Sequence, residues 1–207
     1  MRCSLRALAT AGALSVSAIA GAQQYNVRTM TAPGVTLSRL HSFHLLPTPA
    51  RRDGARRSGA YDPMVSNSIA NRALRGTVSG ELEALGYHDS EWLTEFVVAI
   101  YATTRERLDL DTWQYGYHNS PPWWPVTSPE ETGTSFPDRT VIIDVVNPET
   151  LDVLWRGSAT IELDHDPLQN AKQIVNAAAA IINKFPRVKP IVVAAMRTRG
   201  REHSRLP

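Results

Sequence analysis

The order of helix and strand patterns along this chain constrains its fold more than any other feature. Two stretches with helical periodicity, 62–85 and 166–185, each begin with an Asp-Pro pair, in which the acid can cap the helix and the proline suits its first turn. Strand-like stretches lie at 35–46, 93–104, 139–146 and 153–162. The order strand, helix, three strands, helix predicts an α+β fold. We expect a two-layer sandwich, with both helices on one face of a largely antiparallel sheet of four to five strands.

The apolar spacing also predicts which helical side chains face the sheet. In the first helix these are Ile69, Ala73, Val78, Leu82 and Leu85, and in the second they are Ile174, Ala178, Ile181 and Phe185. Pro148 fits the first corner of a turn between the last two strands, which predicts that these strands form a hairpin.

The first 22 residues have the features of an export signal. Arg2 and Arg6 precede an apolar run from Ala7 to Ala20 that is shorter than the ~20 residues of a membrane span, and Ala20 and Ala22 supply the small residues that a signal peptidase needs. We expect cleavage after Ala22 and a periplasmic or secreted protein with no transmembrane segment in its mature form. A buried N-terminal helix is the alternative, but the run has no polar face.

Cysteine and charge further restrict the mature chain. Cys3 is the single cysteine and would leave with the signal, and no cysteine follows the apolar run at the position where lipid would be attached. We therefore predict neither a disulfide nor a lipid anchor. Without Arg2 and Arg6 the chain has 20 basic and 20 acidic residues, with basic clusters at 51–57 and 197–205 flanking an acidic centre. The predicted organisation is a signal at 1–22, a linker at 23–34, one domain at 35–186 and a basic tail at 187–207.

Several pieces of the sequence, in their order and spacing, resemble a family of bacterial envelope proteins called domain of unknown function 4136. These pieces are the strand before Pro47, Leu85-Gly86-Tyr87, the Tyr- and Trp-rich insertion, 141–146, 154–159 and Asn183-Lys184-Phe185-Pro186. The resemblance implies an envelope location and an α+β domain, with no catalytic residues to transfer. This chain departs from relatives at Leu151, where they usually have glycine. If that position needs a positive φ, leucine there costs about 1 kcal/mol.

The aromatic insertion contains the candidate ligand-binding residues. These are Trp113, Tyr115, Tyr117, Trp123 and Trp124, with three prolines among the last of them. Exposed aromatic rings on a stiff loop can stack on sugars, on proline-containing peptides or at a membrane interface. The same rings could instead fold over the open face of the sheet and complete the core, and for so many rings in one small domain this second interpretation is favoured.

The remaining polar groups give no recognisable catalytic or metal site. Asp144 and Arg156 fall within neighbouring strands and predict a structural ion pair, for which a surface position is the commoner case. His165 lies between Asp164 and Asp166, but consecutive side chains diverge and Asp166 suits a helix cap, so no metal is predicted. We also predict no cofactor.

These patterns predict a non-catalytic binding or structural module of the cell envelope. Its partner would be a protein, a glycan or a lipid surface of the envelope and not nucleic acid, which is a poor candidate outside the cytoplasm. One alternative is a periplasmic hydrolase that uses Asp144, His165 or a loop histidine, although no nucleophile and base are recognisably paired. Another is a peripheral protein that binds anionic membranes through its arginine-rich flanks.

Overall fold

The computed structural model describes residues 25–52, 54, 58–103, 107–113, 115–125, 134–137, 139–162 and 164–190. The helices are α1 (Ile69–Ala84) and α2 (Pro167–Ile182), with short 3-10 turns η1 (Leu37–Arg39) and η2 (Leu110–Thr112). The strands are β1 (Asn26–Thr31), β2 (Ser42–Leu45), β3 (His88–Asp89), β4 (Phe96–Ala102), β5 (Leu108–Asp109), β6 (Ser135–Phe136), β7 (Thr140–Val146) and β8 (Val153–Thr160). The predicted signal at 1–22 and the end of the predicted tail, 191–207, lie outside the described residues.

Six strands form the main sheet in the order β1-β8-β7-β4-β2-β3. The pairs β1/β8, β8/β7 and β7/β4 are antiparallel, whereas β2 runs parallel to both β4 and β3. The α+β class is therefore confirmed and the predicted hairpin forms as β7 and β8. The strand count of four to five was too low, because β1 and the very short β3 add the two edges of the sheet.

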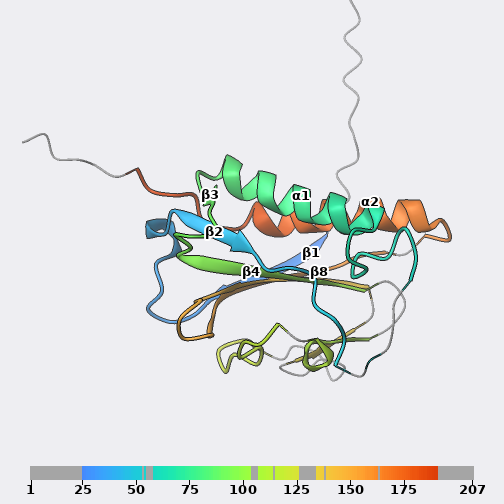
Figure 1. Ribbon diagram of the computed structural model, residues 1–207, viewed down its shortest axis with the longest axis horizontal. Coiled ribbons are helices and arrows are strands. Elements are labelled where there is room, and N and C mark those ends of the chain that lie inside the picture. The colour runs from blue at the N-terminus through green and yellow to red at the C-terminus, as the bar shows by residue number, and fades with distance from the viewer. Residues whose placement is uncertain are drawn as a thin grey trace, which may run out of the picture.

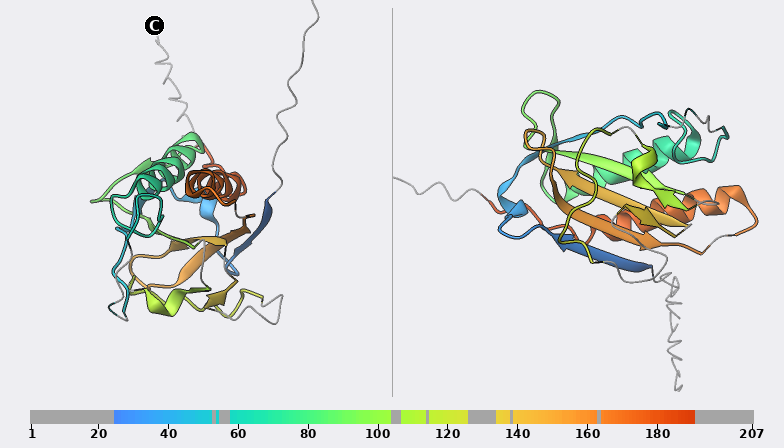
Figure 2. Two further views of the ribbon diagram at one scale, coloured as in Figure 1. Left: turned by 90° about the vertical axis from the view of Figure 1, so that its right-hand side faces the viewer. Right: turned by 90° about the horizontal axis from the view of Figure 1, so that it is seen from below.

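Three layers are stacked, not two (Figures 1 and 2). Both helices cover one face of the sheet, as predicted. The insertion between β4 and β7 covers the opposite face and carries the small β5/β6 sheet. Strand β4 shows why both faces need a cover: Phe96, Val98 and Ile100 join the core beneath the helices, while Ala99 and Tyr101 join a second core beneath the insertion. This alternation is the one expected from a strand with two buried faces.

The first helix begins later than the sequence predicts. Asp62 accepts a hydrogen bond from the Met64 backbone N–H at 2.9 Å, and this turn places Met64 in the core beneath the insertion. Ser68 is the actual cap, because its Oγ accepts from the Asn71 N–H at 3.0 Å. The predicted sheet-facing residues Ile69 and Ala73 are exposed. The face that packs on the sheet consists of Ala70, Leu74, Val78 and Leu82.

The N-terminal part of the domain also differs from the prediction. The stretch interpreted as one strand at 35–46 contains η1 followed by the shorter β2. The stretch interpreted as a linker at 23–34 contains β1, which pairs with β8 along its full length, from Asn26 opposite Thr160 to Thr31 opposite Trp155. This strand is largely exposed and polar, so it lacks the apolar alternation by which a strand is recognised in sequence.

The second helix agrees closely with its prediction. Asp166 caps it by accepting from the Leu168 N–H at 2.9 Å, and all four predicted sheet-facing residues are buried. The helix lies very close to β8 at Gly157, where an added Cβ would stand 2.3 Å from Ile181 Cγ2 and 2.5 Å from the Trp155 ring. Only glycine fits at this contact.

Candidate interaction surface

Most of the predicted aromatic binding residues are inside the protein. Trp113, Tyr117 and Trp124 are buried in the core between the sheet and the insertion. Tyr115 and Trp123 are partly buried and pack against the same core. The structure thus places these rings as the core-completing interpretation expected, and they do not form one exposed stacking surface.

Asp144 and Arg156 form an ion pair beneath this aromatic layer. They lie opposite each other on β7 and β8, with Arg156 Nε 2.6 Å from Asp144 Oδ1 and Nη2 2.6 Å from Oδ2. Both side chains have no exposed surface. The surface position favoured from the sequence is therefore wrong, because the insertion closes over this part of the sheet.

Further contacts tie the insertion to this ion pair. Tyr117 donates to Asp144 Oδ2 at 2.6 Å, and its hydroxyl is 2.6 Å from that of Tyr101. Arg156 donates to the carbonyl of Asn119 at 2.8 Å. Burial, together with the Asp144 charge, raises the pKa of Tyr117 and of Tyr101 well above the ordinary value for tyrosine. The hydroxyls stay protonated, so the cluster acts as a neutralised cross-link between the insertion and the sheet.

The histidines do not gather into a site. His44 Nδ1 lies 3.3 Å from Asp89, His118 Nδ1 lies 3.2 Å from Asp152, and His165 is exposed beside the cap of α2. Within the described ranges, no group of three or more His, Cys, Asp or Glu residues is placed to hold a metal ion. The same residues contain no helix long and apolar enough to cross a membrane.

The most exposed large apolar side chains lie elsewhere, in the loop between β3 and β4. Trp92 is 90% exposed and Leu93 is 78% exposed, whereas the next such residue among those described, Ile69, is 49% exposed. Trp92 is not among the binding residues predicted from the sequence, and Leu93 lies outside the strand to which its sequence pattern assigned it, because β4 begins at Phe96. A signal was present, because Glu91 and Glu95 bracket this apolar pair and indicate a surface loop.

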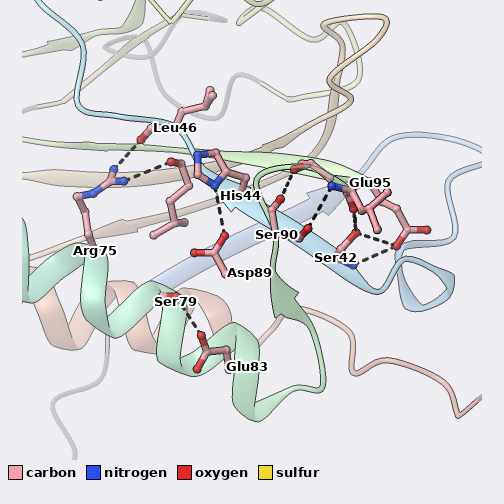
Figure 3. A network of polar contacts seen from close by, with 12 residues as sticks. Ser42, His44, Leu46, Arg75, Ser79, Glu83, Asp89, Ser90 and Glu95 are labelled. Atoms are coloured by element: carbon pink, nitrogen blue, oxygen red, sulfur yellow. Dashed lines mark hydrogen bonds and ion pairs between the residues drawn. The ribbon is translucent and has the colours of Figure 1, made fainter.

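Hydrogen bonds within and below this 90–95 loop fix its shape (Figure 3). The Leu93 N–H donates to Ser90 Oγ at 3.1 Å, and the Thr94 hydroxyl donates to the Ser90 carbonyl. Ser42, a buried residue at the start of β2, donates its hydroxyl to the Leu93 carbonyl. The loop therefore holds Trp92 and Leu93 outward on a fastened backbone, which lowers the entropy lost on binding.

Glu95 completes the attachment of the 90–95 loop to β2. Its Oε2 accepts from the backbone N–H groups of His41 at 2.6 Å and Ser42 at 3.0 Å (Figure 3). Burial alone would raise the pKa of Glu95, but these two donors outweigh it and hold the pKa below its ordinary value. With Asp89 and Glu91, both exposed, Glu95 gives the apolar pair an acidic surround.

Comparison with known proteins identifies the family. Residues 27–187 match the family described as Domain of unknown function (DUF4136). The chain belongs to this family. The matched region includes all of β1 except Asn26. No curated protein matches the chain.

Two solved structures illustrate how distant the structural similarities of this DUF4136 domain are. A PelC dodecamer from Paraburkholderia phytofirmans is 9% identical, with 79% of this chain and 98% of that chain covered and a TM-score of 0.40. A PDZ domain protein from Parabacteroides distasonis is 10% identical, with 79% and 36% covered and a TM-score of 0.41. Neither similarity is close enough to assign a function to this chain.

Proposed function

We propose that this DUF4136 protein is an exported, non-catalytic binding module of the cell envelope that engages another envelope component through the 90–95 loop. The observation that carries the proposal is the exposure of Trp92 and Leu93 on a loop fastened to the sheet. Tryptophan is enriched among the residues that contribute most to protein–protein binding, and the exposed leucine beside it adds apolar area that a partner can bury.

Export rests on the N-terminal sequence. The positive start, the short apolar run and the small residues up to Ala22 support a cleaved signal. Mass spectrometry of the protein isolated from its native cells tests this directly. A mature N-terminus at Gln23 supports export, and a protein that retains Met1 in the cytosolic fraction contradicts it.

The non-catalytic part of the proposal is supported by where the titratable groups lie. Asp144, a base considered for a hydrolase, is enclosed together with Arg156 and has no exposed surface through which a substrate could be reached. His165 neighbours Asp166, but that carboxylate is engaged in capping α2. A binding role is favoured because the exposed feature of the domain is apolar and carries no paired nucleophile and base.

The acidic surround favours a partner with a basic surface over an anionic membrane. Asp89, Glu91 and Glu95 would repel anionic headgroups near Trp92. Sedimentation with anionic vesicles tests the membrane alternative, which requires binding that weakens as salt is added.

The binding test compares two variants in a crosslinking pull-down from envelopes. In the first, Trp92→Ala is combined with Leu93→Ala. The matched control is Ile69→Ala, which removes the next most exposed large apolar side chain from a distant part of the surface. We expect the double variant to lose partners that the control retains. Equal recovery of every partner by both variants would exclude the 90–95 loop as the binding surface.

A further inference from the structure

The C-terminal end of the described chain is attached to the end of α1 and to the segment that precedes β2. The Val188 N–H donates to the Leu85 carbonyl at 3.1 Å, and the Lys189 N–H donates to the Ser38 carbonyl at 2.9 Å. Tyr87 donates its hydroxyl to the Pro186 carbonyl at 2.8 Å. Residues 187–190 belong to the predicted tail, but these bonds fix them against the domain.

Both attachments use the same short segment of the N-terminal part. Ser38 holds Lys189, and Ser42, four residues later, holds Leu93. Since a residue spans at most about 3.6 Å, these two points are no more than about 14 Å apart. Figure 1 shows the red C-terminal segment passing the end of the sheet at which β2 and β3 lie. The chain after Pro190 therefore continues from the same end of the sheet as the 90–95 loop.

The sequence beyond Pro190 is apolar and then basic, and this character is complementary to that of the 90–95 loop. Residues 191–196 are Ile-Val-Val-Ala-Ala-Met, and Arg197, Arg199 and Arg201 follow at alternate positions. The loop also combines apolar residues with charges, but its charges have the opposite sign, because an apolar pair lies next to exposed carboxylates. Apolar residues of the segment can cover Trp92 and Leu93, while the guanidinium groups pair with the carboxylates.

We propose that residues 191–201 of the same chain bind over the 90–95 loop and cover Trp92 and Leu93. This inference rests on the proposed function, because it concerns access to the same surface. Exposed ion pairs contribute little to the free energy of binding, so the burial of apolar surface supplies the attraction and the arginines orient the segment. An external partner must displace the segment, and the partner's contact region is expected to be apolar and basic as well.

Paramagnetic relaxation in the full chain tests the contact. A nitroxide is attached through Met196→Cys in a Cys3→Ser background, and the tryptophan indole N–H signals are recorded with ¹⁵N-labelled protein. Trp92→Phe assigns the Trp92 signal. We expect the nitroxide to broaden the Trp92 signal and to leave that of Trp123 sharp, because Trp123 lies in the insertion on the opposite face of the sheet. Replacing Ile191, Val192 and Val193 with Ser should restore the Trp92 signal, because apolar burial supplies the attraction.

Three outcomes would overturn the inference. These are a sharp Trp92 signal in the nitroxide-labelled chain, equal broadening of Trp92 and Trp123, and broadening that appears only when the labelled and ¹⁵N-labelled molecules are different copies. Combination with the pull-down separates the two proposals. Partner capture that depends on Trp92 without broadening leaves the binding surface standing and removes the segment as its occupant. Broadening of Trp92 with partner capture unaffected by the loop variant supports the contact and removes the proposed function.

Discussion

Removal of one member of the buried ion pair should destabilise the protein more than removal of both. Arg156→Met leaves the Asp144 carboxylate with no exposed surface and, among the contacts described here, only the Tyr117 hydroxyl as a donor. Breaking such a pair costs about 3–5 kcal/mol. Because domains of this kind unfold at about 5–15 kcal/mol, that loss is a large part of the total.

The double replacement Asp144→Leu with Arg156→Met removes both charges and keeps apolar volume beneath Trp124 and Phe136. Tyr117 loses Asp144 as an acceptor but keeps the Tyr101 hydroxyl at 2.6 Å, and the Asn119 carbonyl loses its Arg156 donor, so the remaining cost is about 1–3 kcal/mol. We therefore expect the double variant to be more stable than Arg156→Met alone. Urea unfolding, followed by circular dichroism, measures the free energy of unfolding of the unaltered protein, of Asp144→Leu, of Arg156→Met and of the double variant. A double variant that loses the sum of the two single losses would refute this reasoning, because the charges would then contribute independently.

Three further predictions concern single positions. Gly157→Ala should lower the free energy of unfolding by about 1–3 kcal/mol in thermal or urea unfolding, because the added Cβ would stand 2.3 Å from Ile181 Cγ2. An unchanged unfolding midpoint would contradict the close approach of α2 to β8. Leu151→Gly should raise the free energy of unfolding by up to about 1 kcal/mol, because Leu151 has a φ of 61°, and a loss of stability would show that its side chain matters more than its backbone. Glu95 should keep its hydrogen bonds to His41 and Ser42 above pH 4.5 and lose them as the pH falls through its lowered pKa, so the chemical shift of the His41 amide should titrate below pH 4.5. This titration should be absent in Glu95→Gln, and a midpoint above pH 4.5 would contradict the lowered pKa.

The sequence predicts best those elements whose side chains are buried in a regular pattern. Strands β4, β7 and β8 and helix α2 all have such patterns, and the structure places them within a few residues of the predicted bounds. The positive φ at Leu151, which the resemblance to relatives with glycine had raised as a condition, is also present. The family assignment is confirmed by the match over 27–187.

The predictions that failed depended on tertiary contacts. β1 is recognisable as a strand only through its pairing with β8, and β3 has only two residues. The burial of Asp144 depends on the insertion between β4 and β7, which covers this residue from a different part of the chain. The exposure of Trp92 does not follow from the density of aromatic residues along the chain, because it depends on which of them the sheet can cover.

The pairing of β1 with β8 joins the first strand of the domain to the last. Asn26 meets Thr160, so a chain synthesised from its N-terminus cannot close this edge until almost the whole domain has been made. Until then β1 has no neighbour, and it presents its row of free backbone groups to any extended peptide nearby. Closure of this edge is therefore expected as a late and slow step of folding, and it is the step at which association with another unfinished copy would compete most strongly.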